Sequence, residues 1–235
     1  LFRERALPDL GANIKCGNSL IGPDFYEDAQ LSLLDDEERY RVNVFDWERE
    51  FPFIGAGGGF DAVIGNPPYI RQEGLGEFKD HFARTYEVYH GVADIYAYFI
   101  EKAVKLTRRD GYFSYIVANK WLRANYGQPL RRWLKARNIE EIVDFGDLPV
   151  FERATTYPCI IRLRGMRRPA PAFRAVRVGT LEFADLSAYV DEHAHMVAVD
   201  SLDEAGWSLA DERSQALLEK IKAAGVPLGT YVEGK

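Results

Sequence analysis

The chain has 235 residues, of which 47% are hydrophobic and 28% are charged, and its formal net charge is −6 at pH 7. That size and apolar content suit one domain, or one domain plus part of another, with ample core. No apolar run reaches the length of about 18 residues that a membrane-spanning helix needs, and the two distant cysteines, Cys16 and Cys159, exclude a disulfide framework and favour a reducing cytoplasm.

The first third of the chain is predicted to contain short elements. Residues 13–21 are expected to form a short strand that ends in a polar turn. Residues 27–50 are acidic and amphipathic, which favours a helix. Residues 53–59 contain four glycines and no basic residue, so they predict a flexible turn and not a phosphate-binding loop.

The rest of the chain alternates between strand and helix patterns. Helical patterns lie at 94–108, with Gly111 as a stop signal, and at 129–137 and 209–224, and a polar loop with a short helical stretch lies at 69–91. Apolar, strand-like runs lie at 61–65, 112–118, 139–145, 157–163, 173–178 and 196–199. This order predicts an α/β fold of the doubly wound kind.

The strand at 61–65 leads directly into Asn66-Pro67-Pro68-Tyr69. Ligands of open α/β sheets bind at the carboxyl ends of the strands. At that place Asn66 offers an amide, the prolines fix the direction of the Pro67 carbonyl, and Tyr69 offers a flat ring. These groups suit a planar ring that carries an amine, although a plain strand-ending turn is the simpler alternative.

The motif and its neighbours carry a family resemblance. Asn-Pro-Pro-Tyr after such a strand resembles motif IV of amino-methyltransferases that depend on S-adenosyl-L-methionine (AdoMet), above all the N6-adenine DNA methyltransferases. Over residues 8–165 the chain resembles the type IIG restriction–modification and BREX-type phage-defence enzymes in particular. The segments that carry this likeness are Asn13-Ile14-Lys15-Cys16-Gly17-Asn18-Ser19-Leu20-Ile21, Tyr69-Ile70-Arg71-Gln72-Glu73, Ala118-Asn119-Lys120-Trp121-Leu122 and Asn125-Tyr126-Gly127.

The resemblance implies a fold and a set of catalytic residues. The fold is the C-terminal half of a Rossmann-like, AdoMet-dependent methyltransferase sheet with helices on both faces. Asn66, Pro67, Pro68 and Tyr69 are the implied catalytic residues: the Asn66 side-chain oxygen and the Pro67 carbonyl accept hydrogen bonds from the amine, and Tyr69 stacks on an adenine turned out of the duplex. Phe151 is implied as the second aromatic contact of that base, with a place in the core as its alternative.

Other positions match weaker parts of the family pattern. Asn18 stands where many relatives carry Asp, and it is predicted to contact the flipped base and, with Asn66, the cofactor, or else to form a turn. Asp94 and Tyr96 match motif V, where Asp94 is expected to cap a helix. Asn119 and Lys120 follow the strand at 112–118, where they line the pocket or approach a phosphate.

Positive charge is concentrated between residues 102 and 177, which hold 17 Lys/Arg against 6 Asp/Glu. This asymmetry indicates a surface that faces a polyanion, or else a solvated helix face followed by a basic loop. The predicted DNA-binding residues are Lys120, Arg162, Arg164, Arg167 and Arg168, in a basic stretch that continues through Arg174 and Arg177. The four histidines have no ligand spacing, so no metal is expected.

Residues 1–165 are expected to form the catalytic core, and residues 166–235 a basic linker and the start of a target-recognition region. The family's AdoMet-binding loop has no counterpart before Asn13. We therefore expect a fragment that binds AdoMet poorly and is inactive alone. The expected partners are double-stranded DNA and the remaining parts of its own full-length chain, in a prokaryotic cytoplasm and away from any membrane.

The predicted activity is site-specific methyl transfer from AdoMet to adenine N6 in a restriction–modification or phage-defence system. Two alternatives stay open: a protein-glutamine or rRNA methyltransferase, which also uses Asn-Pro-Pro-Tyr, and a DNA-binding scaffold that has lost catalysis. The sequence leaves open the recognition site, the oligomeric state and the presence of a nuclease domain.

Overall fold

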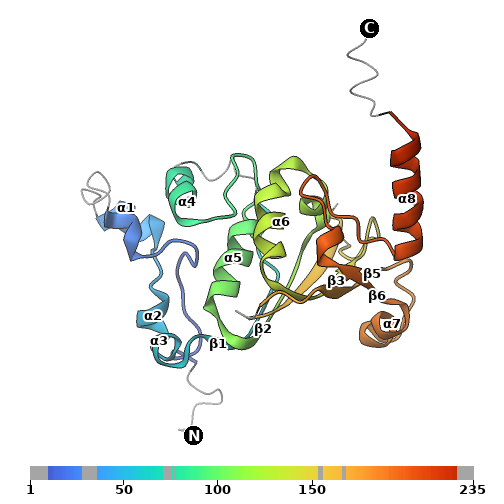
Figure 1. Cartoon of the computed structure of the whole chain (residues 1–235). Coiled ribbons are helices and arrows are strands. Elements are labelled where there is room, and N and C mark those ends of the chain that lie inside the picture. Colours follow the sequence, from blue (N-terminus) through green and yellow to red (C-terminus); the bar gives the residue numbers. More distant parts are fainter. Residues whose placement is uncertain are drawn as a thin grey trace, which may run out of the picture. The chain divides into compact units, whose positions relative to one another are not determined.

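The computed structural model describes residues 10–27, 36–70, 76, 78–152, 156–165 and 168–226 (Figure 1). The chain divides into two compact units, residues 1–60 and residues 61–235. None of the helices in the described part of the chain is long and apolar enough to cross a bilayer.

The first unit is held together by aromatic rings between short helices. Its elements are η1 (Pro23–Glu27), α1 (Asp36–Val42), α2 (Trp47–Glu50) and α3 (Phe53–Gly57). The ring centroids of Trp47 and Phe51 lie 5.8 Å apart, and Phe60 lies 5.5 Å from Phe51 and 5.2 Å from Phe53. Edge and stacked pairs of this kind stabilise beyond their buried area, so these rings tie α2, α3 and residue 60 together.

Three expectations for the first unit are corrected. The strand expected at 13–21 is wrong, because Asn18 forms only an isolated bridge with Val44. The helix expected at 27–50 is interrupted: α1 ends at Val42, and α2 begins at Trp47 after Asp46 caps it through the Arg49 amide at 3.1 Å; residues 28–35 lie outside the described part. The glycine-rich stretch forms α3, which ends at Gly58 with a φ of 73°.

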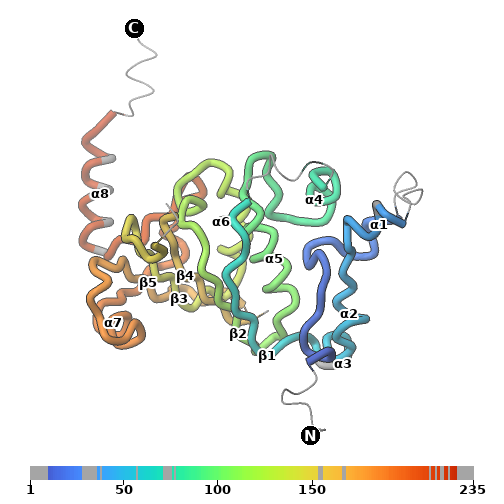
Figure 2. The backbone as a smooth tube through the Cα atoms, turned by 180° about the vertical axis from the view of Figure 1, so that it is seen from behind, coloured from blue at the N-terminus to red at the C-terminus, as the bar shows by residue number. Residues whose placement is uncertain are grey.

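The second unit is built on a mixed sheet of six strands in the order β1-β2-β4-β3-β5-β6. Strand β4 runs antiparallel to both β2 and β3, so β2 and β3 are parallel, as are β3 and β5. Figure 2 shows β3, β4 and β5 side by side. The strands are β1 (Phe60–Gly65), β2 (Thr107–Ala118), β3 (Asn138–Asp144), β4 (Pro158–Arg164), β5 (Ala172–Arg177) and β6 (His195–Ala198).

Helices lie on both faces of this sheet. Helix α7 packs its Val190 on Val143 and Val176, and because side chains alternate along a strand, Ile142 and Ala175 point to the opposite face, over which α5 and α6 lie in Figure 1. The helices and 3₁₀ turns are α4 (Lys79–Thr85), α5 (Tyr96–Leu106), η4 (Asn119–Leu122), η5 (Asn125–Gly127), α6 (Gln128–Lys135), α7 (Leu186–His193), η6 (Val199–Ser201) and α8 (Glu212–Ala224).

A buried carboxylate fixes the approach to α5. The fully buried Glu101 accepts hydrogen bonds from the amides of Glu87 at 3.2 Å and Val88 at 3.0 Å, and from Lys105 Nζ at 2.6 Å. A buried charge is tolerated only when it is paired and hydrogen-bonded, and these three donors meet that need. The loop between α4 and α5 is thereby held against α5.

Strand β1 forms an edge of the sheet, and Ile64 on it is 84% exposed. Among the described residues, no strand pairs with the outer side of β1.

The α/β fold expected from the sequence is confirmed, and so are the six strands predicted after residue 60 and the helices α5, α6 and α8. The sheet is mixed and not wholly parallel, because β4 returns from β3 and pairs with it antiparallel. Gly111 is not a helix stop, since β2 already begins at Thr107, and α7 was not predicted. Strands β5 and β6 extend the sheet beyond residue 165, and the domain boundary expected there stays a prediction.

Candidate active site

The predicted motif lies at the end of the sheet that is formed by the carboxyl ends of β1, β2 and β3. Gly65 closes β1, and a Cβ at that position would lie 2.8 Å from the ring of Tyr115, so only glycine allows this approach to β2. The Tyr69 hydroxyl donates to the Ile116 carbonyl at 3.4 Å. The end of β1 is thus next to the last residues of β2. The carboxyl ends of β2 and β3 lie at the same end of the sheet.

Within the motif, the four side chains differ in exposure. Pro67 is buried and anchors the turn, whereas Asn66 and Pro68 are exposed and Tyr69 is 39% exposed. Burial, with Cys159 nearby, raises the pKa of Tyr69, so its phenol stays protonated at neutral pH and can donate to Ile116. The Asn66 amide is open to a ligand, and the Tyr69 ring is held at one end with part of its surface free.

A second layer of tyrosines supports Tyr69. The Tyr96 ring centroid lies 6.3 Å from that of Tyr69. Burial is the main cause that raises the pKa of Tyr96 well above its usual value, with Tyr126 and Asp94 adding to it. The Tyr126 hydroxyl donates to Asp94 Oδ2 at 3.4 Å. Ile95, and not Asp94, is the N-cap residue of α5, so the expected cap is wrong and Asp94 binds Tyr126 instead.

The ends of β2 and β3 are locked together by Asn119 and Asp144. Asn119 Nδ2 donates to Asp144 Oδ1 at 2.7 Å, and the Gly146 amide donates to the same oxygen at 3.0 Å. Asp144 is buried, and Gly146 has a φ of 58°, which favours glycine. Asn119 therefore positions this edge of the sheet, while Lys120 beside it is exposed. Sequence analysis missed Asp144, although a carboxylate directly after an apolar strand is a usable signal.

The buried thiol of Cys159 lies close to this lock. Burial is the main cause that raises its pKa, and the charge of Asp144 raises it further. The thiol therefore stays protonated, and it serves as a small apolar residue under the site. Among the described residues, no group of three or more His, Cys, Asp or Glu side chains could hold a metal ion.

Two further predicted base contacts are Asn18, in the first unit, and Phe151, in the second unit. The side-chain Oδ1 of Asn18 accepts from the Leu20 backbone amide at 3.4 Å, and its backbone amide donates to the Asn43 carbonyl at 2.6 Å. These bonds are those of a turn, and its contact with base or cofactor stays a prediction. Phe151 follows Val150 in the loop after β3 and is only partly buried, so its ring keeps free surface.

Two of the predicted DNA-binding arginines, Arg162 and Arg164, contact neighbouring side chains within the sheet. Arg162 lies 3.3 Å from Glu140 and 3.5 Å from Glu141. Arg164 stacks over Tyr112 at 3.8 Å. Arg162 and Arg164 thus lie within β4. Arg168 is exposed, and Arg167 lies outside the described residues. The DNA contacts of all four remain a prediction.

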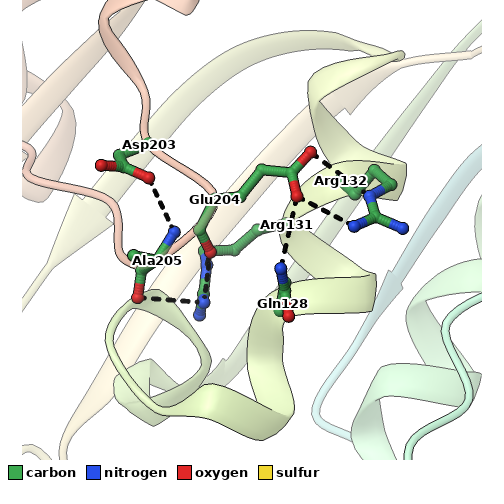
Figure 3. Close-up of polar contacts among 6 residues, drawn as sticks. All are labelled: Gln128, Arg131, Arg132, Asp203, Glu204 and Ala205. Atoms are coloured by element: carbon green, nitrogen blue, oxygen red, sulfur yellow. Dashed lines mark hydrogen bonds and ion pairs between the residues drawn. The ribbon is translucent and has the colours of Figure 1, made fainter.

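A buried arginine of α6 ties the loop after β2 to a later segment (Figure 3). Arg131 is 1% exposed and donates to the carbonyls of Trp121 and Ala124 in that loop. It also donates to Glu204 O at 3.0 and 2.7 Å and to Ala205 O at 3.2 Å. Burial lowers the pKa of Arg131, and Asp203 and Glu204 oppose this. Its side chain is the centre of what we call the Arg131 clasp, residues 121–131 with 202–207. Sequence analysis missed it.

Comparison with protein families and with curated proteins gives one consistent result. The family described as Eco57I restriction-modification methylase matches residues 5–151. The chain is 29% identical to the type II restriction enzyme and methyltransferase RM.Eco57I of Escherichia coli over 233 residues, 96% of this chain and 21% of that protein. It is 35% identical to the type II methyltransferase M.PaeR7I of Pseudomonas aeruginosa over 106 residues, 44% of this chain and 18% of that one. The chain thus spans about a fifth of the length of these relatives.

Solved structures share the fold. The type IIG restriction endonuclease BpuSI has a TM-score of 0.51 and 14% identity over 69% of this chain and 22% of its own. A type I restriction-modification methyltransferase subunit from Streptococcus thermophilus has a TM-score of 0.50 and 14% identity over 80% of this chain and 46% of its own. The methyltransferase fold expected from the sequence is confirmed by these likenesses.

Proposed function

Because this chain belongs to the Eco57I restriction-modification methylase family, we propose that it forms the target-base half of a DNA methyltransferase that methylates adenine N6 in double-stranded DNA. One observation carries the proposal: Asn66-Pro67-Pro68-Tyr69 follows β1 with the Asn66 amide exposed, Pro67 buried and part of the Tyr69 ring free. An amide and a ring that are held but open suit an amine on a planar base.

The chemical difficulty lies in the nucleophile. The lone pair of adenine N6 is delocalised into the ring, so the amine attacks poorly. Two acceptors, the Asn66 side-chain oxygen and the Pro67 carbonyl, bind the two N6 protons and thereby favour a pyramidal nitrogen with a localised lone pair. The bound amine is also aligned for an in-line displacement, and such positioning supplies about 7–11 kcal/mol when reacting groups are well oriented.

Solved structures that share this fold include a methyltransferase subunit. We propose AdoMet as the methyl donor of this chain. When bound, it would supply an electrophilic methyl group. Asn66 is exposed and accessible to such a group, which fits the proposed contact of Asn66 with it; Asn18 is the second proposed contact. The residues around β1 offer an amide, a carbonyl and a ring, which suit the base to be methylated. The chain's own part is therefore to bind and orient the target amine.

The function is tested by incubating the full-length protein with tritiated AdoMet and unmethylated genomic DNA, RNA or cell protein. After digestion of the DNA to nucleosides, we expect label in N6-methyl-deoxyadenosine. Label in RNA or in protein would contradict the proposal and favour the other methyltransferases that use this motif. DNA binding without any label would favour a scaffold that has lost catalysis.

Tyr69 provides a narrower prediction. Its ring is proposed to stack on the flipped adenine, with Phe151 on the other side, and base–aromatic stacking contributes about 1–3 kcal/mol. Tyr69→Ala is therefore expected to weaken extrusion of the base by about 5–150-fold. Tyr69→Phe keeps the ring, loses only the 3.4 Å bond to Ile116, and is expected to behave like the wild type.

The measurement is the fluorescence of a DNA duplex in which 2-aminopurine replaces the target adenine, and the duplex is titrated with the full-length protein. Alanine and phenylalanine variants that lose extrusion equally would show that the hydroxyl matters and not the ring. An alanine variant with wild-type fluorescence would contradict the stacking role.

A further inference from the structure

A cleft of about 720 Å³ opens beside the carboxyl ends of β3 and β5. Its wall includes Asp144 at the end of β3, Arg177 at the end of β5, and Arg123 directly after η4. His195 at the start of β6 and the segment 206–211 close the other side. The cleft therefore lies at the same edge of the sheet as the lock between Asn119 and Asp144.

The two arginines of the cleft differ from Arg162 and Arg174 in their partners. Arg162 is paired with Glu140 and Glu141, and Arg174 lies 2.7 Å from Asp191. Arg123 and Arg177 are exposed, and within the described ranges neither of them takes part in an ion pair. Their guanidinium groups remain free to bind an anion from outside.

The acidic and histidine groups of the cleft already have partners. Asp144 accepts from Asn119 and Gly146, and Asp211 caps α8 by accepting from the Ser214 amide at 2.7 Å. His195 Nε2 hydrogen-bonds to the Leu209 carbonyl at 2.9 Å, and His193 stacks on Tyr189 with ring centroids 4.2 Å apart. The cationic donors of the cleft are the two arginines, whose planar forks match the oxygens of a phosphate.

The position of Arg177 sets the distance to the motif. A Cβ on Gly146 would lie 3.4 Å from Arg177 Nε and Nη2, so this guanidinium borders the loop that follows Asp144. In the sheet order, four strand spacings separate β1 from β5, which Arg177 ends, and they amount to about 19 Å. That distance equals about five to six steps of 3.4 Å along a DNA strand, which is short enough for one duplex to deliver a base to Asn66 and reach the cleft.

We propose that Arg123 and Arg177 in this cleft each bind a backbone phosphate of the substrate DNA, a proposal that rests on the function proposed above. Phosphate contacts hold the DNA in register but carry no sequence information. Within the basic stretch that the sequence predicted to face DNA, Arg177 is the residue that the geometry assigns to this contact.

The test measures DNA binding by full-length protein as a function of salt. Arg177→Gln, Arg123→Gln and the double variant are compared with the wild type between 50 and 200 mM salt, a range over which phosphate contacts dominate affinity. Each single change should lower the slope of log K against log salt by about 1 and the double change by about 2. The weakening should be equal on duplexes with and without a methylatable site.

The matched control is Arg108→Gln. Arg108 lies at the opposite end of β2 and is ion-paired with Asp61 at 2.7 Å, so it loses the same charge away from the cleft and its slope should equal that of the wild type. Equal slopes for Arg177→Gln and Arg108→Gln would overturn the proposal, as would a loss confined to the methylatable duplex. If the protein methylates adenine but the arginine variants keep the wild-type salt slope, the phosphate contact in the cleft is wrong and the proposed function stands. If the variants lower the salt slope but the protein does not methylate adenine, the proposed function is wrong and the phosphate contact stands.

Discussion

Asn66→Ala in the full-length protein is expected to lower the rate of methyl transfer by about 10²–10³-fold, the usual effect of removing one preorganised polar partner of the reacting group. The variant loses the side-chain oxygen that accepts from the amine and keeps the Pro67 carbonyl. Because the Asn66 side chain is exposed, its removal leaves no buried group without a partner, and the free energy of unfolding should stay unchanged. The loss should thus appear in the rate of the chemical step and not in the affinity for DNA.

Single-turnover kinetics with saturating DNA separate the two effects. Asn66→Asp keeps an acceptor oxygen at the same place, so it should retain more activity than the alanine variant. The control is Asn138→Ala. It removes an amide at the amino end of β3, which is the end of the sheet opposite to the motif. A rate for Asn66→Ala within threefold of the control would reject Asn66 as an acceptor of the amine.

Arg131→Met is expected to lower the free energy of unfolding by about 3–5 kcal/mol. The substitution fills similar space with an apolar side chain, but it removes the Arg131 donor from the carbonyls of Trp121, Glu204 and Ala205, while the Ala124 carbonyl keeps the Gly127 amide at 3.0 Å. A buried polar group left unsatisfied costs about 1–3 kcal/mol, and the costs are not additive because the 202–207 segment can move away. The Arg131 clasp should therefore open before the sheet does.

Urea unfolding of residues 1–235 measures the total loss, and hydrogen exchange in the full-length protein localises it. The Trp207 amide, which donates to the Leu122 carbonyl at 2.7 Å, should exchange about 100-fold faster, as a change of about 3 kcal/mol requires. Arg132→Met is the control, since the adjacent Arg132 is exposed and binds the exposed Glu204 side chain. A similar effect of both variants would mean that charge on α6, and not the buried bonds, matters.

Local patterns carried the predictions that proved right. The strand before Asn66, the periodic helix α5 and the amphipathic helix α6 are each set by residues close in sequence, so their types were readable. The family resemblance then supplied roles for Asn66 and Tyr69 that composition alone does not give.

Features that depend on distant pairing were not readable. Asn119 meets Asp144 only because β4 lies between β2 and β3, and Arg162 meets Glu141 only through the register of β3 with β4. Arg131 sits among polar residues of an amphipathic helix, where a charge ordinarily faces water, and nothing local indicates the carbonyls of 204 and 205 around it. Helix α7 was missed because only its Val190 is buried.

The edge of β1, with which no strand in the described part of the chain pairs, has a consequence for anyone who produces residues 1–235 by themselves. An uncovered strand offers a row of unpaired amides and carbonyls that another molecule can extend, and the nearly bare Ile64 adds an apolar contact at the same place. Self-association of the isolated polypeptide would begin there, so its yield and shelf life depend on how well that single strand is shielded.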